Sequence, residues 1–143
     1  MLLRKFENKD RKQVITLIGK ILYEIFKAKP KGVELGKGLF KKGGVLYVAE
    51  EKGKIIGTIG IRKQIGRTAR LKKMYIEKSY RGTGLAQKLY NTIESFAKKK
   101  RYRKIILSTT PEMKAAIKFY KKQGFVEYMS NKRKNQIFSY KKL

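Results

Sequence analysis

The residues with the clearest chemical potential form a short glycine-rich run, Arg81-Gly82-Thr83-Gly84-Leu85-Ala86, between a predicted strand and a predicted helix. Glycine at such a junction lets backbone N–H groups approach an anion closely, and the start of a helix adds unpaired donors and the positive end of its dipole. A phosphate or pyrophosphate fits this chemistry. The alternative is a tight glycine turn without a ligand. The run matches neither a dinucleotide fingerprint, which needs a third small residue at Gln87, nor a P-loop.

The residue types that the chain lacks narrow its chemistry further. None of the 143 residues is Cys, His or Trp. Without thiols and imidazoles there is no disulfide, no zinc site of the usual kinds, no Cys nucleophile and no His general base. Triad chemistry and zinc hydrolysis are therefore excluded, and no metal site is predicted.

Hydrophobic periodicity predicts the elements that position the glycine run. Apolar residues at three- and four-residue steps predict one helix from Asp10 to before Pro30 and a second after Gly84. Strands are expected at 2–6, 45–50, 55–61, 71–76, 105–107, 125–129 and 137–140. With a third helix before Gly124, the order is β-α-βββ-α-β-α-ββ, a mixed α/β fold. A chain of 143 residues fits a single domain, 1–143.

Cap residues predict where two of the helices begin. Asp10 is expected to cap the first helix in a capping box with Gln13. Thr110 is expected to cap the third helix, with Pro111 at its first position. The Lys- and Gly-rich stretch 28–44 is expected to be a mobile connection with one helical turn.

Two segments resemble the GNAT superfamily of N-acetyltransferases. The coenzyme A loop of that family reads Arg/Gln-x-x-Gly-x-Gly/Ala, and Arg81, Gly84 and Ala86 occupy its fixed positions directly after a predicted strand. A second family element, Ala-Ile-x-Phe-Tyr-x-x-x-Gly-Phe, runs from Ala116 to Phe125. The resemblance covers essentially the whole chain. It implies a twisted, mostly antiparallel central sheet of about seven strands, flanked by about four helices and split into a V between strands four and five.

The resemblance also implies residue roles. Acetyl-coenzyme A would lie in the V-shaped opening, where an acceptor amine attacks its thioester directly. The pyrophosphate is expected to bind to backbone amides of the glycine run, namely Arg81, Gly82, Thr83, Gly84, Leu85 and Ala86. The pantetheine arm is expected to pair with the strand edge at Met74, Tyr75 and Ile76. An amide of that edge could polarise the thioester carbonyl.

Tyr120 corresponds to the tyrosine that protonates the departing thiolate in this family. A phenol of pKa about 10 can donate to a thiolate whose conjugate acid has a pKa of about 8.5. The alternative for Tyr120 is a core aromatic, because it shares a helical face with Met113, Ala116 and Ile117.

Two positions depart from the family pattern. Arg70 stands where many members carry a glutamate general base, and Met113 stands where many carry an asparagine that touches the pantetheine. Glu24, Glu34 and Glu77 are the carboxylates that could replace the base, although each also reads as a surface residue. Arg70 could instead hold a carboxylate or phosphate of the acceptor.

The net charge of +28 favours an anionic acceptor, because such a surface attracts anions and repels polyamines. An acidic metabolite, an aminoacyl-tRNA or a ribosome-bound protein would fit. The alternative is that lysine usage follows genome composition, since 29 of the 38 cations are Lys.

The competing functional class is a nucleic-acid-binding module that keeps the fold without catalysis. Its support is the basic run Lys98 to Lys104 with Tyr102 interleaved, and the run Lys132-Arg133-Lys134. No apolar run approaches the about 20 residues of a membrane span, and the N-terminus reaches charge early. A soluble, cytoplasmic protein is therefore expected, and its oligomeric state is left open.

Overall fold

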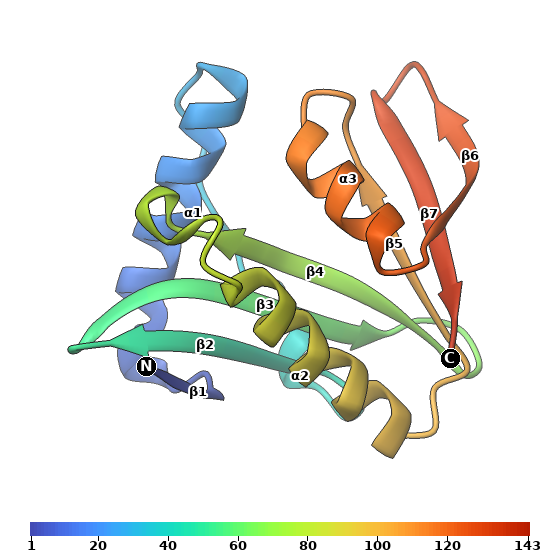
Figure 1. The fold of residues 1–143 in the computed structure, drawn as a ribbon, viewed down its shortest axis with the longest axis horizontal. Coiled ribbons are helices and arrows are strands. Elements are labelled where there is room, and N and C mark those ends of the chain that lie inside the picture. The colour runs from blue at the N-terminus through green and yellow to red at the C-terminus, as the bar shows by residue number, and fades with distance from the viewer.

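The protein, in a computed structural model that describes residues 1–143, contains one seven-stranded sheet with the order β1-β2-β3-β4-β5-β7-β6 (Figure 1). The strands are β1 (Leu2–Lys5), β2 (Val45–Glu51), β3 (Lys54–Lys63), β4 (Thr68–Ile76), β5 (Lys104–Thr109), β6 (Val126–Asn131) and β7 (Gln136–Lys142). Every neighbouring pair is antiparallel except β4 and β5, which are parallel. The predicted order of elements and the mixed α/β class are confirmed.

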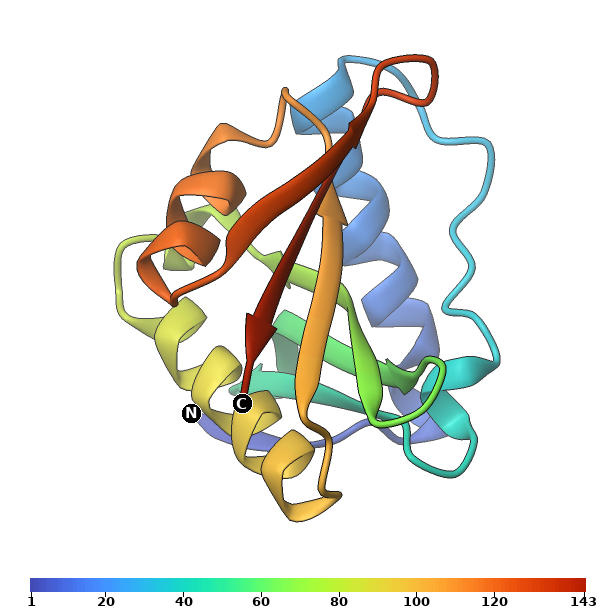
Figure 2. The same ribbon diagram turned by 90° about the vertical axis from the view of Figure 1, so that its right-hand side faces the viewer.

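Three α-helices cover the sheet unequally. Helix α1 (Arg11–Phe26) lies on one face, whereas α2 (Leu85–Lys99) and α3 (Lys114–Lys122) lie on the other (Figures 1 and 2). Single 3-10 turns at 8–10, 38–40 and 78–80 add to these helices, where the resemblance implied about four helices. The face of β5, β7 and β6 opposite α3 has no helix over it (Figure 2).

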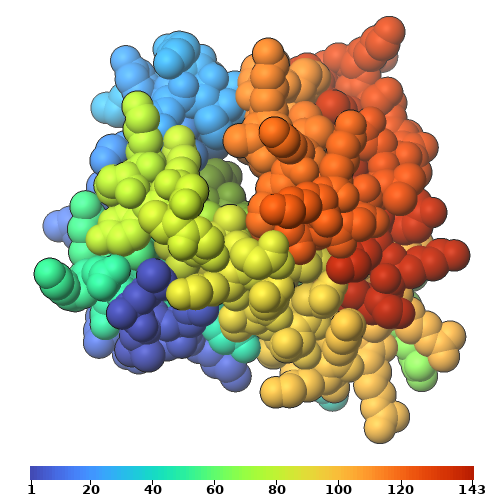
Figure 3. Space-filling view, in the orientation of Figure 1, coloured from blue at the N-terminus to red at the C-terminus, as the bar shows by residue number.

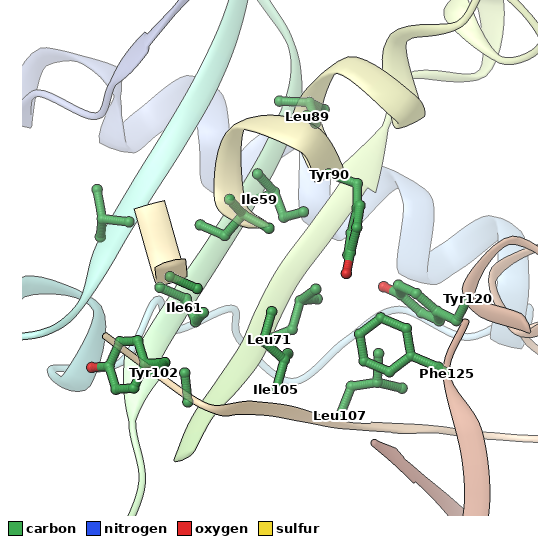
Figure 4. Close-up of a cluster of buried hydrophobic side chains, with 14 of the residues drawn as sticks. Ile59, Ile61, Leu71, Leu89, Tyr90, Tyr102, Ile105, Leu107, Tyr120 and Phe125 are labelled. Carbon is green, nitrogen blue, oxygen red and sulfur yellow. The ribbon is translucent and has the colours of Figure 1, made fainter. Parts of the chain in front are cut away.

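Each face of the sheet has its own apolar core. Leu85, Leu89 and Ile93 project from α2 onto Ile59 and Ile61 of β3, in a cluster that continues to α3 (Figure 4). On the opposite face, α1 packs its apolar stripe against β2 and the 38–40 turn; the residues are Val14, Leu17, Ile18, Ile21, Leu39, Leu46 and Val48. Burying each such side chain contributes about 1.5–3 kcal/mol.

The parallel pair β4–β5 is short. It extends only over Thr68↔Lys104, Ala69↔Ile105 and Arg70↔Ile106, after which the two strands separate. From Leu71 to Ile76, β4 therefore has β3 as its only strand neighbour. The predicted V-shaped split between strands four and five is confirmed.

The predicted capping box of the first helix is wrong. The Asp10 carboxylate accepts hydrogen bonds from both terminal nitrogens of Arg4, at 2.8 Å each, and from the Glu7 N–H, so it does not cap α1. The Gln13 side chain instead accepts from the Ile55 N–H at 2.9 Å and donates to the Gly53 carbonyl at 3.2 Å. Asp10 therefore pairs with Arg4, and Gln13 pairs with the β2–β3 turn, in place of the expected pairing between Asp10 and Gln13.

The predicted start of the third helix is also wrong. Helix α3 begins at Lys114 with Met113 as its N-cap residue. Thr110 and Pro111 lie in a preceding turn, which the Met113 N–H closes by donating to the Thr110 carbonyl at 3.0 Å. Gly124 does follow the helix as expected, with a φ of +100° that suits glycine.

Candidate functional site

The glycine run presents a row of unpaired backbone donors. Gly82 and Gly84 have φ values of +77° and +88°, and a Cβ on either would meet nothing within 4 Å. No backbone N–H from residue 82 to residue 87 donates to a protein acceptor, whereas the Arg81 N–H donates to the Lys78 carbonyl at 3.2 Å. The donors from Gly82 onward lie at the positive end of the α2 dipole, so together they fit an anionic group such as a phosphate.

Arg81 holds this loop in place through its side chain. Its Nε donates to the Ile76 carbonyl at 3.1 Å, and its Nη1 lies 3.1 Å from Oε2 of Glu24 on α1. The loop is thereby tied to the end of β4 and to the opposite helix. Glu24, a candidate base in the sequence, is engaged as the partner of this arginine.

Strand β4 carries an irregularity at the split. The β3–β4 register shifts between Thr58 and Gly60, and Lys73 adopts a left-handed φ of +57°. The hydroxyl of Thr58, which is fully buried, donates to the Lys73 carbonyl at 2.6 Å. This bond holds a β-bulge in β4, next to the edge that β5 leaves open. The sequence did not indicate the bulge.

Tyr120 reaches from α3 to this edge. Its hydroxyl donates to the Met74 sulfur at 3.3 Å, and its ring packs against Phe119 and Phe125 with centroids 5.8 and 5.6 Å apart. In Figure 4 the hydroxyl of Tyr120 points toward that of Tyr90. Burial, with a smaller effect of Tyr75, raises the pKa of Tyr120, so the phenol stays protonated at neutral pH. Its ring therefore belongs to the core, and its hydroxyl lies at the open edge of β4.

These elements surround a hollow in the surface. In Figure 3 the hollow lies between the chain around the end of β4 and the start of α2, in yellow-green, and the chain before and within α3, in orange. The structure thus places Tyr120 against Met74 and Arg81 against Ile76, while the roles that the sequence analysis assigned to these residues stay predictions.

The remaining candidate acids are Glu77, which directly follows Ile76, and Glu34. Glu77 is 7% exposed; it accepts a hydrogen bond from the Ser79 hydroxyl and lies 3.5 and 3.6 Å from the ammonium groups of Lys20 and Lys54. The Ser79 bond and these cations lower the pKa of Glu77, so it is a poor proton acceptor. Glu34 is exposed, and its charge partly offsets the burial that lowers the pKa of Lys73.

Arg70 lies at the last β4–β5 pair before the split, on the side of the sheet opposite α2. Its Nη2 donates to the Ser108 hydroxyl at 3.0 Å, and its guanidinium lies 5.9 Å from the centre of the Phe138 ring. The sequence singled out Arg70 but not Ser108 or Phe138, because these contacts join strands far apart in the chain. No group of three or more Asp and Glu side chains is arranged to hold a metal.

The aromatic part of the nucleic-acid interpretation is wrong. Tyr102 is 7% exposed, and its hydroxyl donates to the Gly43 carbonyl at 2.6 Å, so its ring cannot stack on a base. Lys98, Lys99 and Lys100 are exposed at the end of α2. None of the helices combines the length and apolar composition that crossing a bilayer requires.

Comparison with known proteins gives a consistent result. The profile of the acetyltransferase (GNAT) family matches residues 12–125. The N-acetylaspartate synthetase of Xenopus tropicalis is 33% identical over 84 residues, which are 58% of this chain and 31% of that protein. The chain therefore spans about a third of the length of that relative.

Solved structures extend the similarity to the whole chain. The acetyltransferase of the GNAT family from Staphylococcus aureus MU50 superposes with a TM-score of 0.87 at 22% identity, over 99% of this chain and 98% of the other. The PaiA N-acetyltransferase of Thermoplasma acidophilum, solved in complex with coenzyme A, gives a TM-score of 0.84 at 16% identity, with the same coverage. At these identities the structures show a shared fold.

Proposed function

Because this chain belongs to the acetyltransferase (GNAT) family, we propose that it is an N-acetyltransferase that moves an acetyl group from acetyl-coenzyme A to an acceptor amine. The observation that carries the proposal is the row of unpaired amides at 82–87, beside a β4 edge that β5 leaves open. An anionic head and an extended amide-containing arm are the two features of coenzyme A that such a surface can bind.

The residues present fit this co-substrate. Backbone amides of Gly82, Thr83, Gly84, Leu85 and Ala86 would bind the pyrophosphate, and the open edge at Met74, Tyr75 and Ile76 would pair with the pantetheine arm. Arg81 contributes by fixing the loop, since its own amide is used within the protein. When bound, the co-substrate supplies an acetyl group activated as a thioester. The bulge at Lys73 turns the backbone of β4 at the point where an amide could polarise the thioester carbonyl.

Tyr120 is proposed as the general acid. In the overall reaction a C–N bond forms, the C–S bond breaks, the amine loses a proton and the sulfur gains one. The Tyr120 hydroxyl lies at Met74, on the edge expected to hold the arm, and it is protonated at neutral pH, so it carries the proton that a departing thiolate needs.

Two of the three candidate carboxylates are engaged within the protein, and the third, Glu34, is an exposed residue of the 28–44 connection. Glu24 is paired with Arg81, and Glu77 is held by Ser79 and two lysines. We therefore propose that the acceptor amine arrives neutral or loses its proton to water.

The proposed acceptor is anionic and binds near Arg70. The net charge of +28 favours an acidic molecule, and the name of the Xenopus relative identifies an acidic amino acid as what that enzyme acetylates. An acceptor attached to RNA or the ribosome is a second candidate, favoured by the exposed lysines that end α2. A cytoplasmic location is part of this proposal.

Acetyl-coenzyme A should raise the Tm of the protein, by linkage worth about 2.7 kcal/mol at 100 times its Kd. Gly84→Val should abolish the shift, because a side chain there blocks the approach of a phosphate to the amides. Gly53→Val is the matched control: Gly53 has a φ of +80° and equally open surroundings but lies in the β2–β3 turn. It should bear the same backbone strain and keep the shift. The absence of a shift in the parent protein would refute the proposal.

A further inference from the structure

Three cations form a patch on the α1 side of the sheet, which we call the cation cluster: Arg62, Arg70 and Lys72. Arg62 and Arg70 are directly opposite each other in the β3–β4 register, and Lys72 follows two residues after Arg70 on the same strand face. Their neighbours Ile61 and Leu71 point into the core under α2, so the cluster points to the other side. The stem of Arg62 lies against Gly38 there.

The cluster has no counter-charge within the protein. None of the ion pairs involves Arg62, Arg70 or Lys72, so no carboxylate lies within 4.0 Å of them. All three are only partly exposed. Partial burial and then mutual repulsion lower the pKa values of Arg70 and Lys72. Like charges directly across a strand pair destabilise a sheet. The three charges therefore oppose folding, whereas a bound anion would neutralise them.

The guanidinium of Arg70 is held in place and still has free hydrogen-bond donors. Arg70 uses one of its five N–H donors on Ser108 and lies over Phe138, which fixes the plane of the guanidinium. The ammonium group of Lys72 makes no hydrogen bond within the protein, and Lys72 precedes the bulge residue Lys73. Arg70 stands at the last β4–β5 pair, so the cluster lies where the split opens, and a molecule bound there would reach Tyr120 and Met74 through the split.

We propose that the acceptor is a small primary amine with two acidic groups, which the cation cluster binds while the amine faces the split. The proposal deepens the N-acetyltransferase function and rests on it. Residues two apart on a strand are separated by about 7 Å, so Arg70 and Lys72 suit two acidic groups of one short molecule. Arg62 lies opposite Arg70 and would bind the same acidic group of the acceptor as Arg70. A single carboxylate would leave most of the charge of the cluster unopposed. A dicarboxylic amino acid has this chemistry, and so does an amino acid phosphate.

A panel of amines tests the preference. Release of coenzyme A thiol would be measured with L-aspartate, L-glutamate, O-phospho-L-serine, L-alanine and spermidine. The diacids should exceed L-alanine in kcat/KM by about 10- to 100-fold, the range for one charged hydrogen bond. Comparing O-phospho-L-serine with L-aspartate and L-glutamate shows whether the second acidic group is preferred as a phosphate or as a carboxylate. Equal or better rates with L-alanine or spermidine would overturn the proposal.

Variants assign the preference to the cluster. Arg70→Gln and Lys72→Gln should each raise the KM for the best diacid by about 10- to 100-fold and leave the KM for acetyl-coenzyme A unchanged. Lys72→Gln should not lower the Tm, because it relieves repulsion and breaks no side-chain hydrogen bond. Arg70→Gln also removes the bond to Ser108, so its effect is judged from the separate KM values and not from the Tm. Arg67→Gln is the matched control, since Arg67 is exposed and loses the same charge three residues earlier. Identical kinetics for Arg70→Gln and Arg67→Gln would refute the assignment.

Calorimetry keeps this inference separate from the proposed function. L-glutamate and O-phospho-L-serine would be titrated into the protein with and without coenzyme A. Binding that Lys72→Gln weakens and Arg67→Gln preserves supports the cluster even if no acetyl transfer is detected. A normal thermal shift with acetyl-coenzyme A, combined with no binding or turnover of any diacid, would reject the diacid site alone.

Discussion

The two halves of the sheet, on either side of the split, are built differently. In the first half, β3 is enclosed between α1 and α2, and every residue from Ile55 to Ile61 is buried. In the second half, β5 to β7 are covered by α3 on one face only, and Val126 to Ser130 of β6 are exposed. The enclosed half fixes backbone positions, namely the bulge and the amide loop. The half-covered part contributes side chains, namely Tyr120, Ser108 and Phe138.

The largest expected effect tests whether the enclosed half carries the stability. Ile59→Ala should lower the free energy of unfolding by about 2–5 kcal/mol, because Ile59 is fully buried and the cavity cannot be filled by rigid neighbours. Tyr128→Ala in β6, where the side chain is 49% exposed, should cost about 1 kcal/mol or less. Urea unfolding would measure both. Equal losses would mean that the halves share stability evenly.

The next effect concerns the chemistry supplied by the half-covered part. Tyr120→Phe should lower kcat by about 100-fold with little change in acetyl-coenzyme A binding or in Tm. The matched control is Tyr90→Phe, which removes the hydroxyl of another buried tyrosine, one that donates to Glu94 at 3.0 Å. That change should cost stability and leave kcat intact. If steady-state kinetics show kcat unchanged in Tyr120→Phe, the hydroxyl has no catalytic role.

A third effect, in pH dependence, belongs to the enclosed half. The Arg4 hydrogen bonds lower the pKa of Asp10 below its unfolded value of about 3.9. The resulting stabilisation is complete above that value and is lost as the pH falls through the folded pKa. Asp10→Asn should therefore cost about 2 kcal/mol at pH 7, and the difference from the parent should shrink as the pH falls below about 3.9. Chemical denaturation across this range would show it, and a constant difference would contradict the ion-pair origin.

The smallest effect tests the bulge. Thr58→Val removes the hydrogen bond to the Lys73 carbonyl and should lower stability by about 1 kcal/mol. It should also lower kcat by about 10-fold, because the bulge positions the edge that faces the thioester. Thr58→Ser keeps the hydroxyl and should restore kcat. If Thr58→Val loses only stability, the bulge has no part in the reaction.

Hydrophobic periodicity and glycine positions were enough to predict the helices, the strands and the glycine-rich loop. They did not predict the contacts between strands that lie far apart in the sequence. The donors at 82–87 follow from a short glycine-containing segment, whereas the position of Tyr120 beside Met74 is a long-range contact that only the family resemblance implied. The Thr58–Lys73 bond and the Arg62–Arg70 pair depend on the β3–β4 register, which no single segment encodes. Asp10 was predicted as a helix cap, but its carboxylate accepts hydrogen bonds from Arg4. Tyr102 was interpreted as part of a basic surface, but its hydroxyl donates to the Gly43 carbonyl and its ring is buried.

The bare face of β5, β7 and β6 has an evolutionary consequence. Substitutions at exposed positions usually change stability by no more than about 0.5 kcal/mol, so residues such as Tyr128 and Met129 can be exchanged without threatening the fold. The enclosed half tolerates little change. Substitutions on the bare face can therefore change the surroundings of the cation cluster, which meets this face where Arg70 lies over Phe138, without disturbing the enclosed half that holds the amide loop and the bulge.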